Sequence, residues 1–416
     1  MRVLVVDPNA VRRGELSKAE ALAAAGLTVT VLAPRAWREN YRTLRAPAAW
    51  SGSYRLLRAP VAGKPPNRCL FLGGWREALR PVPEVVLTLS DENFWPTGQA
   101  LALTRLLAPA ARFVCHSWRN LNFNPAWHPQ PWTWLYRADT WLERRVFAGA
   151  DLIVARNREA AAILRQRGYR GAMAFLPWGV DTHQFAPAEG SPARPWDAGG
   201  GINGSEQGLP GDGGDTTRLA SRGTRPGRYT IGFVGRFSPE KGLETLLAAS
   251  ARLAAPHRLL LVGGGPLEAQ VQAWIKRHPQ VPAELAPLVD HARMPELYRR
   301  MDVLVLPSRQ AGFEKEQFGR ALVEAMACGV AVVGSDSGAI PEVLGPGGLV
   351  FPAGDAPALA ERLAVLADPL RRAELAGRGL QRARERFSWA AWALATARML
   401  SDLLAGRLAA PGVEAA

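Results

Sequence analysis

The sequence predicts an α/β protein built from two Rossmann-like domains, each a doubly wound parallel sheet. Two observations support this fold class. Short, continuously apolar runs, typical of buried parallel strands, alternate with helical segments. This alternation occurs twice, on either side of a stretch that is rich in Gly, Asp, Ser and Pro and has almost no apolar residue.

The first half begins with an apolar strand at 1–7 and a helix at 14–26 that ends at a glycine. Strands are expected next at 27–34, 84–90, 111–117, 150–157 and 172–179, with a helix at 158–168. The second half repeats the pattern, with strands at 229–235, 257–265, 302–308 and 330–336 and helices at 242–254, 294–301 and 319–329.

These elements predict four parts of the chain. An N-terminal Rossmann-like domain is expected at 1–186 and a C-terminal one at 229–388. The Gly-rich stretch at 187–228 cannot bury enough apolar surface to fold alone, so it is expected to be a flexible insertion or linker. The segment 389–416 is expected to be a helix with a tail, and this helix is long enough to cross back to the N-terminal domain.

The composition is that of a globular protein, with 48% hydrophobic and 21% charged residues. The net charge of +14 favours anionic partners such as nucleotide phosphates or acidic lipid, and because no nucleic-acid recognition module is present we expect no nucleic-acid partner. Cys69, Cys115 and Cys328 form no CxxC pair, which argues against a zinc site and fits a reducing cytoplasm. No apolar run is long enough for a membrane-spanning helix, and the N-terminus has the pattern of a buried strand, not of a signal peptide.

Candidate ligand-binding residues follow the second domain's first strand, in the stretch FVGRFSPEKG. Gly235 allows a tight exit from the strand, and Arg236 and Lys241 are spaced to hold a diphosphate. The alternative is a pair of solvated surface cations. The next joint, LVGGGP, is a weak signal, because it matches neither the GxGxxG nor the GxxxxGK[ST] pattern.

The stretch FEKEQFGRALVEAMACG holds two glutamates, Glu316 and Glu324, on either side of an expected helix start near Phe318 or Gly319. The free N–H groups of a helix start attract an anion, and a carboxylate can accept hydrogen bonds from a sugar or a ribose diol. The alternative is one acid that complements the helix dipole and one exposed helical glutamate. Spacing alone favours this alternative.

Several motifs occur in order: GFVGRFSPEKG, LLLVGGGPLE, DVLVLPS, EKEQFGRALVEAMACGVAVVGSDSGAIPEVLG and GGLVFPAGD. Together they resemble the donor-binding domain of retaining glycosyltransferases of family 4 (GT4). FLPWGVDTHQF and the segment 137–171 resemble the end of that family's N-terminal domain. The resemblance implies the GT-B fold, with two Rossmann-like domains facing across a cleft.

The resemblance also implies an activity. It would be metal-independent transfer of a hexosyl group from a UDP- or GDP-sugar to a sugar, lipid-linked or small-molecule acceptor, with retention of configuration and no cofactor. Arg236 and Lys241 would hold the diphosphate and stabilise the leaving group. Backbone N–H groups around Phe318, Gly319 and Arg320 would bind the same phosphates or the sugar. Gly235 would be a further donor-binding residue. Glu316 would contact the sugar hydroxyls and Glu324 the ribose.

In the first domain the resemblance places His116 against the donor sugar, although a lone histidine is more often structural. The loop DPNAVRRGELS has only Gly14 where family members often have a Gly-Gly pair, so it is a weaker acceptor-side candidate, together with Trp118 and Asn120. Five tryptophans in 117–141 suit a sugar or lipid acceptor or a membrane interface, or else a loop packed on its own domain. The cysteine pattern and the strand-like N-terminus lead us to expect a cytoplasmic location. Peripheral association at the inner face of the membrane is a further expectation.

Two other functions remain open at the level of sequence. A nucleotide-sugar epimerase of the same fold would convert the donor without any acceptor. A non-catalytic nucleotide-sugar-binding protein is also compatible with the fold, but the presence of Arg236, Lys241, Glu316 and Glu324 argues against it.

Overall fold

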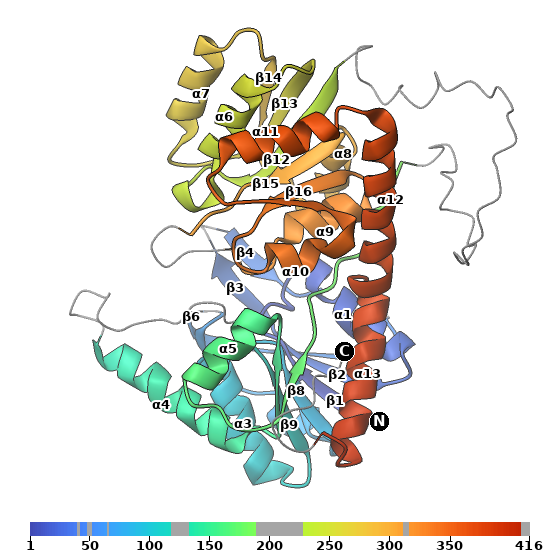
Figure 1. Ribbon diagram of the computed structural model, residues 1–416. Helices are drawn as coiled ribbons and strands as arrows, with labels where there is room; N and C mark the ends of the chain where they lie inside the picture. The colour runs from blue at the N-terminus through green and yellow to red at the C-terminus, as the bar shows by residue number, and fades with distance from the viewer. Residues whose placement is uncertain are drawn as a thin grey trace, which may run out of the picture. The chain divides into compact units, whose positions relative to one another are not determined.

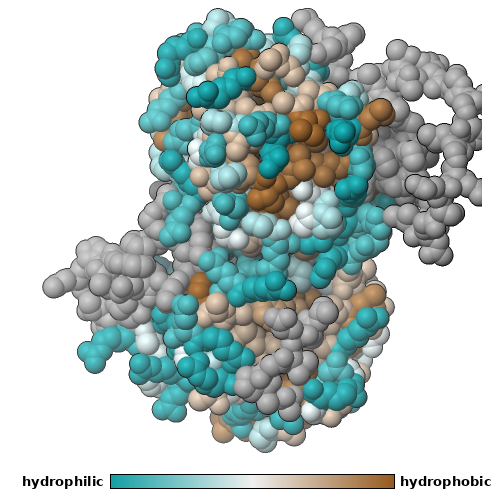
Figure 2. Space-filling view, viewed as in Figure 1, coloured by the Kyte–Doolittle hydropathy of each residue, from teal (hydrophilic) through white to brown (hydrophobic). Residues whose placement is uncertain are grey.

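The computed structural model describes residues 1–39, 42–47, 52–64, 66–117, 133–188, 228–310 and 316–408. The chain forms two compact units (Figure 1). The first unit combines Met1–Gly179 with Ser388–Ala416, and the second is the continuous segment Val180–Phe387. In both units the visible surface mixes hydrophilic and hydrophobic residues, as is usual for globular domains (Figure 2).

The first unit is built on a parallel seven-stranded sheet in the order β11-β10-β9-β8-β1-β2-β5. From β1 the chain moves to one edge, returns to β8 on the other side of β1, and continues to the opposite edge. The strands are β1 (Arg2–Val6), β2 (Thr28–Pro34), β5 (Arg55–Ala59), β8 (Val85–Thr88), β9 (Arg112–His116), β10 (Leu152–Ala155) and β11 (Met173–Phe175). The order reverses between β1 and β8, and ligands bind at such switch points in doubly wound folds.

Both faces of this sheet are buried, which explains why its strands are continuously apolar. Val3 and Val5 of β1 belong to one hydrophobic cluster, whereas Leu4 and Val6 belong to another on the opposite face. The helices are η1 (Arg13–Glu15), α1 (Ser17–Ala24), α2 (Trp75–Ala78), α3 (Trp95–Leu107), α4 (Thr133–Gly149), α5 (Arg158–Gln166) and α13 (Trp389–Leu404).

The C-terminal helix α13 is part of the first unit. Its Trp392 and Leu400 are buried in the same cluster as Leu22 of α1, and the two helices pack against each other. A long apolar stripe on α13 therefore covers one face of a sheet that began at residue 2. Two antiparallel hairpins complete the unit: β3 (Ala36–Glu39) with β4 (Arg42–Arg45), and β6 (Val61–Lys64) with β7 (Arg68–Phe71).

The second unit repeats this topology with six parallel strands in the order β14-β13-β12-β15-β16-β17. The strands are β12 (Tyr229–Arg236), β13 (His257–Gly264), β14 (Ala283–Ala286), β15 (Val303–Leu306), β16 (Ala331–Ser335) and β17 (Leu349–Phe351). The helices are η5 (Pro239–Lys241), α6 (Leu243–Arg252), α7 (Glu268–Arg277), η6 (His291–Arg293), α8 (Met294–Tyr298), α9 (Arg320–Ala327), α10 (Ile340–Leu344), η7 (Gly345–Gly347), α11 (Ala356–Val365) and α12 (Pro369–Arg386). Its switch point lies between β12 and β15.

The predicted fold class, two Rossmann-like parallel-sheet domains, is confirmed. The chain crosses between the units at Gly179 and at Phe387, whereas the sequence-based domain limits are 186 and 388. Val180 donates its N–H to the carbonyl of Phe387 at 2.6 Å, which links the two points of crossing. Most of the predicted insertion, 189–227, lies outside the described residues, and the predicted limits stay predictions that limited proteolysis would test.

Candidate functional site

A pocket of about 360 Å³ lies at the switch point of the second unit. Val234 near the end of β12 and Leu306 at the end of β15 form part of its wall. The lining residues are Val234, Lys241, Leu288, Val289, His291, Met294, Tyr298, Leu306, Glu316, Gly319, Arg320, Ala321 and Glu324. The pocket therefore collects Lys241, Glu316, Gly319, Arg320 and Glu324 from the residues predicted by sequence.

Lys241 and Glu316 form an ion pair in this pocket, with Nζ and Oε2 2.7 Å apart. Ser308 donates its hydroxyl hydrogen to the same oxygen at 3.0 Å, and the N–H of Gly319 donates to Oε1 at 3.1 Å. Glu316 is thus held by a cation that is distant in sequence and by a hydroxyl and a backbone donor that are close to it in sequence. A ligand that displaces one of these donors would still find the other two in place.

Glu324 is buried, with 4% of its surface exposed. Tyr298 donates its hydroxyl hydrogen to Oε2 at 2.7 Å, and the His291 ring nitrogen Nε2 lies 2.8 Å from Oε1. Arg320 Nε lies 3.3 Å from Oε1. The interpretation of Glu324 as an exposed helical acid, which spacing alone favoured, is therefore wrong.

The carboxylate of Glu324 also affects its neighbour Tyr298. Burial raises the pKa of the Tyr298 hydroxyl well above its ordinary value, and the nearby carboxylate raises that pKa further. The hydroxyl therefore stays protonated and remains a hydrogen-bond donor to Glu324.

Helix α9 begins at Arg320, and Gly319 is its N-terminal cap residue. Gly319 has a positive φ of 79°, a conformation that strongly favours glycine. A Cβ at this position would lie 3.1 Å from Leu322 Cδ1 and 3.2 Å from Leu306 Cδ2. The glycine therefore lets the first turn of α9 start directly beside the end of β15.

The other predicted residues of the second unit do not line this pocket. Arg236 has a 60% exposed side chain whose Nη2 lies 2.7 Å from Glu240 Oε1. Partial burial raises the pKa of Glu240, but hydrogen bonds from Ser238 and Arg236 outweigh this effect and lower it to about 2. Phe318 is buried and packs against Phe387 with ring centroids 5.8 Å apart. Gly235 is the next-to-last residue of β12, directly before Arg236.

In the first unit His116 lies at the end of β9 and is 1% exposed. Neither ring nitrogen has a hydrogen-bond partner among the described residues, and the ring lies 5.5 Å from that of Trp178. Burial lowers the pKa of His116, and the positive charges of Arg156 and Lys18 lower it further, to about 3. His116 is therefore neutral at physiological pH.

The loop that holds Gly14 is organised around a buried cation. Lys18 on α1 lies 2.9 Å from Asp7 and 2.6 Å from Glu15, and its ammonium lies 4.5 Å from the ring centroid of Trp178. Gly14 itself would tolerate a Cβ, since no heavy atom lies within 4 Å of that position. No close approach at Gly14 therefore requires a glycine.

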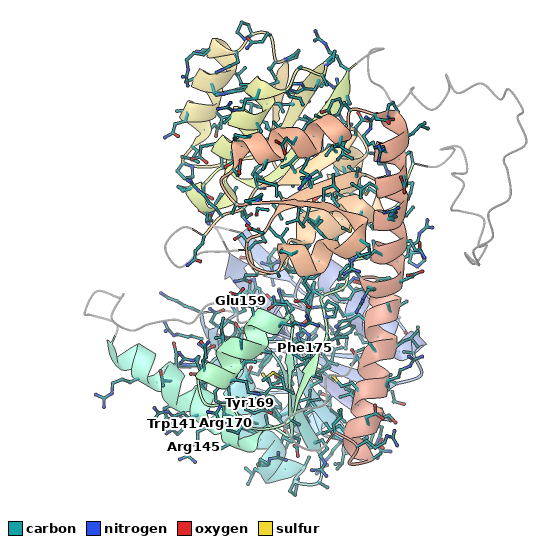
Figure 3. The ribbon with its side chains drawn as sticks, viewed as in Figure 1. Trp141, Arg145, Glu159, Tyr169, Arg170 and Phe175 are labelled. Carbon is teal, nitrogen blue, oxygen red and sulfur yellow. The ribbon has the colours of Figure 1, made fainter. Side chains whose placement is uncertain are left out.

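The acceptor-side candidates Trp118 and Asn120 lie outside the described residues. Trp141, the last tryptophan of the aromatic segment, is 59% exposed on α4. The Arg145 guanidinium lies 5.2 Å from its ring centroid, and both side chains are labelled in Figure 3. The alternative of a tryptophan packed into its own domain does not apply to Trp141.

Sequence reasoning missed His291, Tyr298 and Ser308, which hold the two glutamates. Tyr298 lies in the segment that the sequence predicted only as a short helix. The apolar pattern of that segment predicts the helix but not the partner of its hydroxyl group, because that contact depends on how α8 packs against α9.

Among the described residues, no group of three or more His, Cys, Asp or Glu side chains is arranged to hold a metal ion. Cys69, Cys115 and Cys328 are buried and form no disulfide with one another. Within the same parts of the chain, no helix has both the length and the apolarity needed to cross a bilayer.

Two family models match the chain. Residues 228–368 match a domain described as "Glycosyl transferases group 1", and residues 11–179 match a "Glycosyl transferase 4-like domain". The second match ends at the residue where the chain first leaves the first unit.

Two curated proteins illustrate the sequence similarity. Alpha-maltose-1-phosphate synthase of Mycolicibacterium smegmatis is 29% identical over 327 residues, which cover 73% of this chain and 76% of that protein. D-inositol 3-phosphate glycosyltransferase of Rhodococcus erythropolis is 28% identical over 352 residues, which cover 79% of this chain and 71% of that protein.

Solved structures share the fold. Sucrose-phosphate synthase from Thermosynechococcus elongatus matches with a TM-score of 0.62 at 20% identity and covers 98% of this chain and 100% of its own. Anabaena Alr3699/HepE in complex with UDP matches with a TM-score of 0.61 at 18% identity, covering 97% and 100% of the two chains. This likeness identifies the fold as GT-B.

Proposed function

Because this chain belongs to the group 1 glycosyltransferases of family GT4, we propose that it transfers a hexosyl group from a nucleotide diphosphate sugar to an acceptor hydroxyl, with retention of configuration and without a metal ion. The observation that carries this proposal is the Lys241–Glu316 ion pair, which lies at the start of α9 in the same pocket as Glu324.

We assign the donor's parts to the pocket as follows. The diphosphate would lie between Lys241 and the N–H groups at the start of α9, where the helix dipole favours negative charge. Glu316 would accept hydrogen bonds from the sugar hydroxyls, and Glu324 from the ribose. Because the present partners of Glu324 are donors, a ribose diol would have to replace the exposed His291 or use the remaining lone pairs of the carboxylate.

Arg236 is proposed as the second diphosphate ligand although it does not line the pocket. Its side chain is 60% exposed, and Glu240 also accepts a hydrogen bond from Ser238, so Glu240 keeps a donor when the guanidinium moves. The guanidinium can therefore exchange Glu240 for a phosphate at small cost. Gly235 and Phe318 would act through the backbone, by fixing the ends of β12 and of the loop before α9.

In the proposed reaction, the bond between the sugar's anomeric carbon and the leaving phosphate oxygen breaks, and the acceptor oxygen bonds to the same face of that carbon. The acceptor's proton passes to the leaving phosphate oxygen. Lys241, Arg236 and the helix N-terminus would stabilise the charge that develops on the nucleotide diphosphate. His116, neutral at physiological pH, would serve as a hydrogen-bond partner of the donor sugar and not as a general acid.

The donor is proposed to be a UDP- or GDP-sugar. The fold of this chain is shared with a protein solved with UDP, and one relative is named as GDP-mannose-dependent. The acceptor is proposed to be a sugar, a lipid-linked sugar or a small molecule, because the named relatives differ in this respect. Three cysteines that form no disulfide with one another fit a cytoplasmic location. The exposed Trp141 and the net charge of +14 favour peripheral contact with an acidic membrane.

A donor panel tests the proposal. UDP-, GDP- and ADP-sugars would be compared by thermal shift of the full chain, since a ligand that binds only the folded state raises its melting temperature. Lys241→Met should lower kcat at least about a hundredfold, the usual cost of losing a group that stabilises developing charge. Glu316→Gln should also lower kcat, because it removes the ion pair that positions Lys241 and weakens the contact with the sugar hydroxyls. Lys276→Met, on the exposed end of α7, is the matched control.

The stereochemistry and the alternatives are separated by product analysis. NMR of the product should show the donor's anomeric configuration, and EDTA should leave the rate unchanged. Donor conversion in the absence of acceptor would identify an epimerase instead, and near wild-type turnover in Lys241→Met or Glu316→Gln would refute the assigned site.

A further inference from the structure

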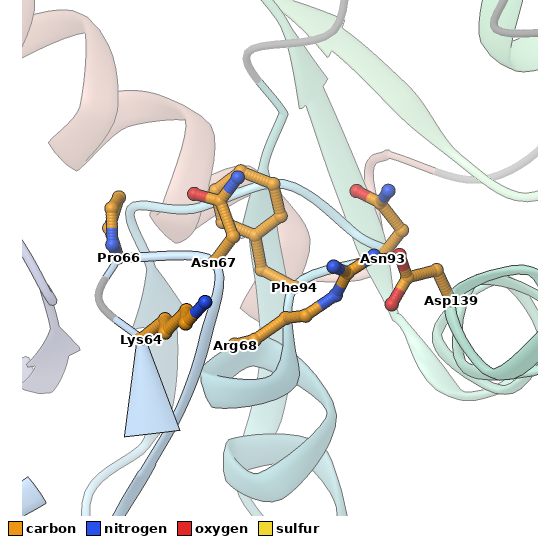
Figure 4. Close-up of a pocket in the computed structure, with 7 residues that line it drawn as sticks. All are labelled: Lys64, Pro66, Asn67, Arg68, Asn93, Phe94 and Asp139. Atoms are coloured by element: carbon orange, nitrogen blue, oxygen red, sulfur yellow. Dashed lines mark hydrogen bonds and ion pairs between the residues drawn. The ribbon is translucent and has the colours of Figure 1, made fainter. Parts of the chain in front are cut away.

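The first unit has a second pocket, of about 300 Å³, beside the turn between β6 and β7 (Figure 4). We call it the hairpin pocket; its lining residues are Lys64, Pro66, Asn67, Arg68, Asn93, Phe94 and Asp139. Asn93 and Phe94 follow β8, so the pocket lies beyond the carboxyl end of a strand at the switch point of this unit. The volume is at the lower end of the range for small-molecule sites.

The charges around the hairpin pocket do not balance. Lys64 and Arg68 are directly opposite each other in the antiparallel pair β6–β7, an arrangement in which like charges repel. Asp139 of α4 compensates Arg68, with Oδ2 2.6 Å from Arg68 Nη2, and its other oxygen accepts from Trp95 Nε1 at 3.3 Å. Lys64 has no ion-pair partner within the described parts of the chain, so the pocket carries one uncompensated positive charge.

The remaining lining groups suit a polyhydroxylated ligand. The side-chain amides of Asn67 and Asn93 make no hydrogen bond to other described residues, and each can both donate to and accept from a hydroxyl. Phe94 adds an apolar surface. The wall is anchored, because the carbonyl of Asn67 accepts the N–H of Trp95 at the start of α3 at 2.9 Å.

We propose that the hairpin pocket binds the acceptor, and that this acceptor is a sugar or polyol carrying one anionic group, a phosphate ester or a carboxylate, which pairs with Lys64. This inference rests on the proposed function and names the substrate class for it. Among the described lining residues, Lys64 is the one cation without an ion-pair partner and matches a single anionic group, whereas the carboxylate of Asp139 disfavours a second one nearby. A nucleotide diphosphate is therefore a poor occupant of this pocket.

Kinetics with matched acceptors tests the inference. A hexose, its 6-phosphate and the corresponding hexuronic acid would be compared at a saturating concentration of the same donor. Lys64→Met should raise KM for the charged acceptors by about tenfold, as expected for losing one charge-assisted contact, with little change in kcat. KM for the neutral hexose should not change, and Lys276→Met should behave as wild type with all three.

A second variant distinguishes binding from mere support of the fold. Asp139→Asn can keep a hydrogen bond from only one of Arg68 and Trp95, because the amide has a single accepting oxygen, and it removes the negative charge that compensates Arg68. It should lower KM for the charged acceptors by a few-fold. The assignment is overturned if Asp139→Asn raises KM equally for all three acceptors, or if Lys64→Met leaves KM for the charged acceptors unchanged.

Direct binding separates failure of this inference from failure of the proposed function. Calorimetry would measure hexose 6-phosphate binding to the full chain, to Lys64→Met and to Lys241→Met. Binding lost only in Lys64→Met supports the hairpin pocket even if no transfer is found with any acceptor. Binding lost only in Lys241→Met would assign the anion to the second unit and overturn the inference, while sugar transfer could still stand.

Discussion

Tyr298 and Glu324 are joined by a hydrogen bond inside the second unit. Loss of this contact should lower both the stability of the fold and the affinity for the nucleotide-sugar donor. Tyr298→Phe removes the hydroxyl that hydrogen-bonds to Oε2 of the buried Glu324 carboxylate, which should cost about 1 to 3 kcal/mol of unfolding free energy. It should also raise the donor's KM or Kd, because Glu324 loses its fixed orientation. Urea unfolding and donor titration measure the two effects.

Tyr229→Phe is the matched control, since Tyr229 donates its hydroxyl hydrogen to the carbonyl of Leu363 at 2.9 Å in the same unit, and Tyr229 does not line the pocket. It should lower stability with no change in donor affinity. An unchanged donor affinity in Tyr298→Phe as well would argue against a ribose at Glu324.

His116 predicts a pH dependence of stability. Its pKa is about 3 in the folded protein and near 6.5 in an unfolded chain, so between these values the unfolded state binds one more proton. The contribution of neutral His116 to the free energy of unfolding is therefore complete above about pH 6.5 and is lost as the pH falls toward 3. From pH 7 to pH 5 the loss should be about 2 kcal/mol.

Urea unfolding at pH 7 and pH 5 measures this loss. His116→Gln should reduce the pH-dependent difference by about 2 kcal/mol, whatever its effect at pH 7, whereas His183→Gln, at an exposed position, should leave the difference as in wild type. An identical pH dependence in wild type and His116→Gln would mean that His116 is protonated in the folded state.

At the scale of elements, the start of α9 depends on Gly319. Gly319→Ala places a Cβ in a left-handed conformation against Leu322 and Leu306, which should cost about 1 to 2 kcal/mol and shift the first turn of the helix. Donor affinity should fall along with stability. Thermal unfolding with and without donor measures both.

Gly354→Ala is a control in the same unit, because Gly354 has a φ of 85° but no heavy atom within 4 Å of a Cβ. Gly354→Ala should lower stability through backbone strain alone, with donor affinity as in wild type. If both variants bind donor equally well, the start of α9 does not contact the phosphates.

The buried strands could be predicted because almost all of their residues are apolar, as in β1, β8 and β15. The helix α12 was not predicted, since its charged sequence buries only a narrow stripe that includes Leu375 and Leu380. The edge strand β14 was missed because none of its residues is fully buried. Elements at the periphery leave a weak hydrophobic signal.

The candidate site was predicted through Lys241, Glu316 and Glu324, which carry charge in recognisable motifs. Their partners Ser308, His291 and Tyr298 could not be predicted. These polar residues reach the two glutamates only because of how α8, α9 and β15 pack together. Lys64 and Arg68 illustrate the same limit, since only the pairing of β6 with β7 brings their charges together.

At the scale of the whole molecule, the first unit is discontinuous in sequence and the second is continuous. A fragment covering 180–387 should therefore fold alone and bind the donor. A fragment covering 1–179 should not fold alone, because it lacks Trp392 and Leu400 of α13, which fill the core above α1. Circular dichroism and urea unfolding of the fragments measure this difference.

Joining 1–179 to 388–408 through a Gly/Ser linker restores the missing helix and should restore cooperative unfolding. Cooperative unfolding of 1–179 without α13 would show that the helix is an accessory to the first unit and not part of its core.

The position of α13 also has a consequence for biosynthesis. A ribosome releases the first sheet early, yet the helix that covers one of its faces leaves the exit tunnel only after the entire second unit has been made. Although N-terminal domains usually fold first during translation, here the second unit can complete its core before the first. Until then the uncovered face, with Leu22 and Val31 among its residues, is a natural substrate for chaperones.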